Sequence, residues 1–113
     1  LADDEEATGL LREEAHEYAS LHRLRTREII RISKPVFRVG KENKYSDYVV
    51  RDNDKVSRSH VNIITRGHRY FVMDLNSTNR TYINDRQIPA RQEVEVFNGD
   101  YLKLADEEFE FRI

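Results

Sequence analysis

Short runs of hydrophobic residues, separated by turn-forming residues, follow one another from Leu21 to the end of the chain. Many contain valine, isoleucine, tyrosine or phenylalanine, which favour β-strands. The runs are LHRLR (21–25), EIIRI (28–32), VFRVG (36–40), YVV (48–50), VNIIT (61–65), RYFVMDL (69–75), TYI (81–83), EVEVF (93–97), YLKL (101–104) and FEFRI (109–113). Glycine, asparagine or aspartate stands between most of them. The pattern therefore predicts many short strands.

Strict alternation of apolar and polar residues in EVEVF and FEFRI indicates strands with one face on a core and the other in water. No segment after Leu21 keeps the 3.6-residue period of a long amphipathic helix. Short strands at this spacing favour an antiparallel sandwich or barrel. The sequence therefore predicts an all-β fold.

The first residues of the chain have a different composition. Residues 1–14 hold six acidic side chains and one arginine, with few large apolar residues. Such a stretch buries too little surface to offset the entropy of ordering it. Residues 10–21, LLREEAHEYASL, also fit a short helix. We interpret residues 1–18 as a flexible acidic N-terminal tail and residues 19–113 as one folded domain.

Composition excludes several classes of protein. The chain has 113 residues, 19 basic and 21 acidic side chains, and a net charge of -2, a length that suits one compact domain. It has no cysteine, which excludes disulfides, thiolate zinc sites and a cysteine nucleophile. No apolar stretch is long enough for a membrane helix, and the acidic start is unlike a secretory signal. We expect a cytoplasmic domain without a membrane partner, and the first residue, Leu1, suggests a piece of a longer protein.

Three turn clusters carry more polar chemistry than a plain connection needs. They are Gly40-Lys41, Ser57-Arg58-Ser59-His60, and the segment 74–81, DLNSTNRT. Cations beside hydroxyls and backbone N–H groups form a natural acceptor site for phosphate. Taken singly, each cluster is better explained by side chains that satisfy local backbone groups in a β-turn. Their convergence on one site is therefore a separate hypothesis.

Together, the three clusters and their separations resemble those of the forkhead-associated (FHA) domain, a family of phosphothreonine-binding β-sandwiches. The resemblance covers the chain from about Leu21 onward. Gly40-Lys41 matches the family's Gly-Arg turn, and Ser57, Arg58 and His60 match its S-R-x-H motif. Residues 77–81, STNRT, match its S-T-N-G-T turn. The resemblance implies a two-sheet antiparallel β-sandwich of the FHA/SMAD-like kind.

The resemblance also implies a role for each matching residue. Lys41 stands where the family's arginine helps bind phosphate, and Ser57 where its serine donates a hydroxyl to the phosphate. Arg58 matches a residue that adds a side-chain contact to the phosphopeptide. Thr78 matches the position whose hydroxyl or amide reaches the phosphate, and Asn79 matches the asparagine that holds the peptide main chain.

Supporting and rim positions follow from the same resemblance. Gly40 and His60 are expected to brace the loops, while Lys55 and Arg80 lie at positions expected to influence specificity at the rim. Two residues depart from the family pattern. Lys41 keeps a cation but loses the planar fork of arginine. Arg80 replaces a glycine, which costs on the order of 1 kcal/mol if the backbone is left-handed there.

Other chemistries have weaker support. Ser57, His60 and Asp74 resemble the members of a catalytic triad, but no G-x-S-x-G elbow accompanies them, so we predict no enzyme activity. The four histidines lack metal-site spacing, and we expect neither a metal nor a cofactor. We interpret the arginines at 23, 25, 27 and 31 as the solvated side of a sheet rather than as a nucleic-acid-binding surface.

The tail contains one candidate phosphosite. Thr8 follows a run of acidic residues and has Leu11 three positions after it. FHA domains commonly read the residue three places after the phosphothreonine, so we hypothesise that phosphorylated Thr8 docks into the site of its own or a neighbouring chain. The alternative is that Thr8 is a polar residue in a solubilising tail.

The sequence thus predicts a phosphothreonine-peptide recognition module within a larger signalling or regulatory protein. Its expected partners are the phosphorylated proteins of a Ser/Thr kinase pathway, and its compact loops favour a bacterial source. The alternative is a phosphate-independent protein–protein interaction domain with the same fold, which the departures at Lys41 and Arg80 keep open.

Overall fold

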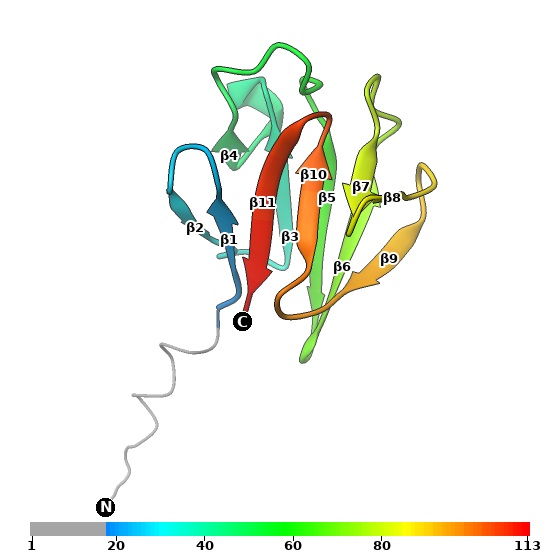
Figure 1. Cartoon of the computed structure of the whole chain (residues 1–113). Coiled ribbons are helices and arrows are strands. Elements are labelled where there is room, and N and C mark those ends of the chain that lie inside the picture. Colours follow the sequence, from blue (N-terminus) through cyan, green and yellow to red (C-terminus); the bar gives the residue numbers. More distant parts are fainter. Residues whose placement is uncertain (1–17) are drawn as a thin grey trace, which may run out of the picture.

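The computed structural model describes residues 18–113 of the chain, which form two packed β-sheets (Figure 1). One sheet has six strands in the order β2 (Ile29–Arg31), β1 (Ser20–Arg23), β11 (Glu107–Arg112), β10 (Tyr101–Leu104), β7 (Thr81–Ile83) and β8 (Arg86–Gln87). The other has five strands in the order β4 (Tyr48–Val49), β3 (Val36–Gly40), β5 (Val61–Arg66), β6 (Arg69–Asp74) and β9 (Glu93–Val96). A short 3₁₀ helix, Asn43–Tyr45, connects β3 to β4. The predicted all-β, two-sheet sandwich is confirmed.

The predicted alternation places the core between the sheets. In β11, Phe109 and Phe111 are fully buried while Glu108 and Arg112 are exposed. Strand β6 alternates in the same way, with Val72 facing the core. Burial of one face of each sheet in this way is what stabilises a sandwich.

One strand pair differs from the antiparallel prediction. Strands β3 and β4 run parallel, with Val39 opposite Tyr48. The reason lies in Asp47, whose carboxylate accepts hydrogen bonds from the backbone N–H of Arg38 at 2.8 Å and from its guanidinium. These bonds draw the returning chain alongside β3 in the same direction, instead of closing a hairpin.

The two ends of the sandwich carry different connections. Figure 1 shows the loops 41–47, 50–60 and 75–80 gathered at one end, which we call the loop end. The β5–β6 hairpin and the C-terminus lie at the opposite end, which we call the far end. All three predicted turn clusters therefore fall at the loop end. No helix in residues 18–113 has the length and apolar character needed to cross a membrane.

The predicted acidic tail lies almost entirely outside the described residues, as do Thr8 and most of the alternative helix at 10–21. Within the described part, the chain is exposed at Tyr18 and buried from Ala19, just before β1 begins.

Candidate functional site

A pocket of about 430 Å³ opens at the loop end, between the three predicted turn clusters. It is lined by Lys41, Asp54, Lys55, Val56, Ser57, Arg58, Ser59, Thr78 and Asn79. The structure thus brings together the five residues predicted to contact a phosphopeptide, and also Lys55 from the predicted rim. Gly40, His60 and Arg80 do not line the pocket.

Hydrogen bonds between loops fix the floor of the pocket. The backbone N–H of Thr78 donates to Ser57 Oγ at 3.1 Å. Asn79 Nδ2 donates to the carbonyl of Lys55 at 2.9 Å. Because Ser57 Oγ accepts from Thr78, its hydroxyl hydrogen is free to point into the pocket and donate to an anion. The 75–80 loop is therefore held against the 50–60 loop by the same residues that line the site.

Gly40 lets two loops come into direct contact. The backbone N–H groups of Lys41 and Glu42 donate to the carbonyls of Ser57 and Arg58, at 2.9 and 3.2 Å. A Cβ atom at Gly40 would lie 2.2 Å from the Arg58 carbonyl oxygen. Glycine is needed at this position because there is no space for a side chain.

His60 braces the site from within the protein. Its ring is fully buried, accepts from the backbone N–H of Ser57 at Nδ1 (3.0 Å) and donates from Nε2 to the carbonyl of Arg80 (3.0 Å). Burial lowers the pKa of His60, so the ring is neutral, as this pair of bonds requires. One side chain thereby joins the loop before β5 to the loop before β7, as the predicted bracing role implies.

The triad alternative has no geometric support. Ser57 Oγ bonds to a backbone N–H rather than to the His60 ring, and both ring nitrogens bond to backbone groups. The Asp74 carboxylate bonds to Ser77 and Thr81 instead. A nucleophile, a base and an orienting acid are therefore not connected here.

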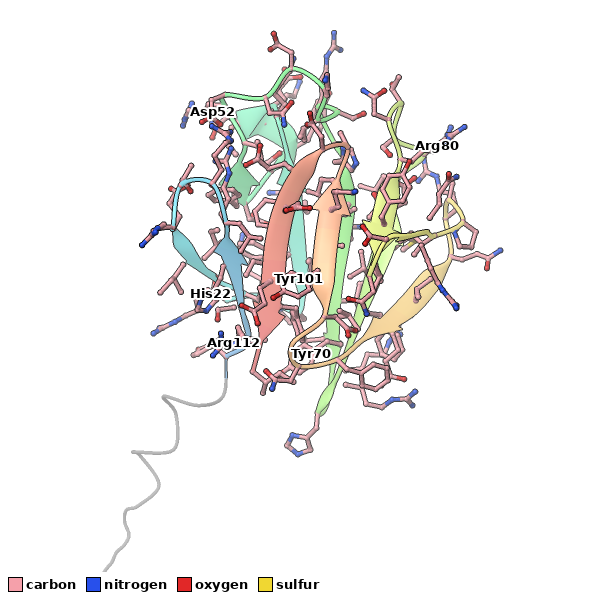
Figure 2. All side chains as sticks on the ribbon, viewed as in Figure 1. His22, Asp52, Tyr70, Arg80, Tyr101 and Arg112 are labelled. Carbon is pink, nitrogen blue, oxygen red and sulfur yellow. The ribbon has the colours of Figure 1, made fainter. Side chains whose placement is uncertain are left out.

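Arg80 adopts the left-handed backbone conformation expected for the glycine it replaces, with φ at 71°. Its guanidinium donates to the carbonyl of Ser77 at 3.3 Å, within its own loop. Figure 2 shows Arg80 on the opposite side of the loop end from Asp52. The predicted rim residue thus caps its own turn rather than lining the pocket.

Each cation around the pocket faces a nearby carboxylate. Lys41 Nζ lies 3.5 Å from Asp54, and Arg58 Nε lies 3.7 Å from Glu42. Asp54 is 97% exposed and the Arg58 side chain 80% exposed, so these pairs are weak and water can separate them. The cations can therefore turn toward an anion without a large cost.

The bonding within two buried polar clusters was not predicted from the sequence. The buried Asp74 carboxylate accepts from the Ser77 N–H, the Ser77 hydroxyl and the Thr81 hydroxyl. The three-residue spacing of Asp74 and Ser77, which is typical of a side-chain-capped turn, was the available signal. The second cluster surrounds Arg23, which is only 3% exposed, so its interpretation as a solvated residue was wrong. Nothing near Arg23 in the sequence indicates that burial.

Comparison with known families tests the resemblance found in the sequence. The family model described as the FHA domain matches residues 37–105. The chain belongs to the FHA domain family. The resemblance found in the three turn clusters is therefore confirmed, and FHA domains are recognition modules rather than enzymes.

Relatives of known identity include the transcriptional regulatory protein EmbR of Mycobacterium tuberculosis, which is 35% identical over 65 residues. That match covers 58% of this chain but only 16% of EmbR, so the chain spans a small part of the curated relatives it matches. A structure of M. tuberculosis EmbR in complex with a low-affinity phosphopeptide superimposes with a TM-score of 0.78 and 29% identity, over 85% of this chain and 24% of that one.

A second solved structure comes from a structural and functional analysis of phosphothreonine-dependent FHA domain interactions. It superimposes with a TM-score of 0.76 and 25% identity, and covers 85% of this chain and 96% of that chain. The pocket described above therefore lies within a fold that this chain shares over most of its length.

Proposed function

We propose that this domain recognises phosphothreonine in an extended peptide, as a module of a larger signalling or regulatory protein in a Ser/Thr kinase pathway. The observation that carries the proposal is the pocket itself. One opening is lined by the cations of Lys41 and Arg58 and by the Ser57 hydroxyl, all suited to a phosphate. The phosphopeptide complex of EmbR supports the same class of ligand.

Each lining residue has a distinct role in this proposal. Lys41 and Arg58 neutralise the phosphate charge and leave their exposed carboxylate partners. The Ser57 hydroxyl donates to a phosphate oxygen, as does the hydroxyl or backbone amide of Thr78. The Asn79 side chain holds the main chain of the peptide. Gly40 and His60 keep the loops in place. The folded unit spans residues 19–113 and works in the cytoplasm.

The test is a binding titration with three versions of one peptide, bearing phosphothreonine, threonine or phosphoserine. The peptide comes from an oriented library screen. We expect saturable binding of the phosphothreonine version alone. Ser57→Ala should weaken it about tenfold or more, because a hydrogen bond to a charged group is worth roughly 1.5–3 kcal/mol. Ser33→Ala, an exposed serine at the far end, serves as the matched control.

The alternative is a phosphate-independent interaction domain of the same fold. Lysine at position 41 is the observation that favours it, because lysine does not reproduce the bidentate fork of arginine. Equal affinity for all three peptides would establish this alternative and refute phosphothreonine recognition.

Thr8 remains a proposed phosphosite outside the described residues. A tethered ligand has an effective concentration of about millimolar for a short flexible linker, which would fill even a weak site. Phosphorylating Thr8 and recording backbone amide spectra tests this hypothesis. We expect the Ser57 and Asn79 signals to move. Unchanged signals at both residues would refute docking of the phosphorylated tail in its own domain.

A further inference from the structure

A buried cluster of charged side chains lies beneath the loop end, centred on Arg23 at the end of β1. Arg23 donates from Nε to Glu107 at 2.7 Å, from Nη1 to Tyr48 at 2.8 Å, and from Nη2 to Asp52 at 2.6 Å. The side chains of Arg23 and Glu107 are 3% and 2% exposed. The Tyr48 hydroxyl in turn donates to Glu28 at 2.6 Å. Three side chains, from β4, the 50–60 loop and β11, thus meet on one guanidinium.

Glu107 adds a second link from this cluster to the 50–60 loop, beside the bond from Arg23 to Asp52. Its second carboxylate oxygen accepts from Asn53 Nδ2 at 2.9 Å. The same amide nitrogen donates to Asp106 at 2.8 Å, and Asn53 Oδ1 accepts from the backbone N–H of Lys55 at 3.0 Å. Asn53 therefore ties the backbone at Lys55 to the first residue of β11.

The connection continues into the pocket through the carbonyl of Lys55. That carbonyl accepts the hydrogen bond from Asn79 Nδ2, and both residues line the pocket. A continuous path of hydrogen bonds thus runs from Arg23 through Glu107, Asn53 and Lys55 to Asn79. Arg23 and Glu107 both lie outside the residues 37–105 that match the family model.

We propose that the Arg23–Glu107 cluster positions Asn79 for the phosphopeptide main chain by fixing the Asn53–Lys55 backbone. This inference rests on the proposed phosphothreonine recognition. In it, Arg23, Glu107 and Asn53 are positioning residues that do not touch the ligand. The Asn79 amide has its orientation set before the peptide arrives, which lowers the entropy lost on binding.

Burial of an ion pair alone is weak support for a gain in stability, because desolvation can exceed the attraction between the charges. A cluster kept only for stability would need no contact with the loop. Here Glu107 has one oxygen on Arg23 and the other on Asn53 and Arg25. Through its second carboxylate oxygen, Glu107 of β11 fixes Asn53 and so the loop that lines the pocket.

The experiment separates the link to Glu107 from the local turn. In Asn53→Ser, a serine hydroxyl still accepts from the backbone N–H two residues later, but it is too short to replace the amide donor to Glu107 and Asp106. We expect affinity for the library-selected phosphothreonine peptide to fall about fivefold to tenfold, the equivalent of one hydrogen bond. Asn53→Ala should lose at least as much.

Asn84 supplies a control of similar chemistry. Its amide donates to the carboxylate of Asp100 at 3.0 Å, and its carbonyl oxygen accepts from the backbone N–H of Tyr101 at 2.9 Å, at a turn that does not line the pocket. Asn84→Ser should therefore change the phosphopeptide affinity less than twofold, even where it lowers stability.

A readout without ligand keeps the two proposals apart. In the free protein, Asn53→Ser should shift the side-chain amide signals of Asn79, whereas Asn84→Ser should leave them in place. Unmoved Asn79 signals together with wild-type affinity would overturn the positioning role. Wild-type protein that binds no phosphothreonine peptide would instead refute the proposed function, and the Asn79 signals would still decide whether Asn53 transmits to the pocket.

Discussion

The two ends of the sandwich are formed by the same strands but are stabilised by different polar interactions. At the loop end, charged and polar groups are buried and shared between loops, as at Arg23, His60 and Asp74. At the far end, the ion pairs Arg66–Glu93 and Arg69–Glu95 lie on the surface and each involves only two side chains. The far end also has a tight hairpin in place of long loops.

The difference shows where this fold needs rigidity. Long loops lose more conformational entropy on ordering than a two-residue turn, so they require specific bonds to hold one shape. The loop end supplies such bonds from buried groups, which water does not compete for. The far end is held by the sheets and by exposed side-chain bonds, such as that from the Phe97 N–H to Asp100, and its ion pairs lie on the surface. Substitutions at matched positions of the two ends should therefore have unequal effects.

The largest difference is expected between two glycines. Gly40→Ala places a Cβ atom 2.2 Å from the Arg58 carbonyl oxygen, so the loops must separate. We expect the free energy of unfolding to fall by about 3 kcal/mol. Gly67, in the far-end hairpin, has φ at 61° and open space around it. Gly67→Ala should cost about 1 kcal/mol. Urea denaturation measures both, and equal losses would contradict the comparison.

A dependence on pH should come from His60. Burial lowers the pKa of His60 in the folded state, so the unfolded chain binds more protons below the usual value of about 6.5. The stabilisation is present above that pH and is lost as the pH falls. Between pH 7.5 and 5.5 we expect the free energy of unfolding to fall by about 1 kcal/mol.

Two histidine variants check the origin of that dependence. His68→Gln, in the exposed far-end hairpin, should keep the same pH dependence as the wild type. A two-dimensional histidine titration should show the folded His60 ring taking up its proton at a lower pH than in the unfolded chain. A His60 ring that titrates as it does in the unfolded chain, or loss of the dependence in His68→Gln, would show that the buried ring is not its source.

A gain in stability is expected at Arg80. Its φ of 71° is unfavourable for a side chain. Arg80→Gly should raise the free energy of unfolding by about 0.5 kcal/mol, the relief of left-handed strain less the glycine entropy and the lost bond to Ser77. Arg80→Ala keeps the strain and loses the bond to Ser77, so it should show no gain. A thermal melt of both variants measures this, and a gain in Arg80→Ala would point to the side chain instead.

The smallest effect is expected for the exposed far-end pair. Arg69→Gln removes the bonds to Glu95, in which the arginine side chain is 65% exposed and the glutamate side chain is half-buried. The unfolding midpoint of the variant should stay within experimental error of the wild-type value. Added salt should change the stability of the two proteins equally. A clear loss of stability would mean that the far end depends on its charges as the loop end does.

Most of the fold could be predicted because its signals are local. Alternation in EVEVF and FEFRI fixes which face is buried, and the turn residues mark where each strand ends. The parallel pairing of β3 and β4 could not be predicted in this way, since it depends on Asp47 reaching the backbone of Arg38. The burial of Arg23 was equally hidden, because its partners come from distant parts of the chain.

The candidate site, like the fold, was predictable from the sequence only where its signals are local. The turn clusters contain the residues that line the pocket, so their chemistry could be seen in the sequence. That the three turn clusters converge on one site was predicted only from the family resemblance. The left-handed Arg80 was expected from a glycine position, yet the direction of its side chain was not, because a carbonyl three residues earlier decides it. Asn53 gave no signal, since its partner Glu107 is far along the chain.

The order of strands in the sheet affects how the domain folds during synthesis. Strand β11 lies in the interior of its sheet, between β1 and β10, although it follows the other strands of the described residues in the sequence. Until it is synthesised, β1 has no neighbour on that side and the edge of β10 stays open. The pairing of β1 with β11 joins segments far apart in the sequence, and such pairings form slowly. A nascent chain stalled before Glu107 would therefore expose unpaired edges and Leu102 to chaperones.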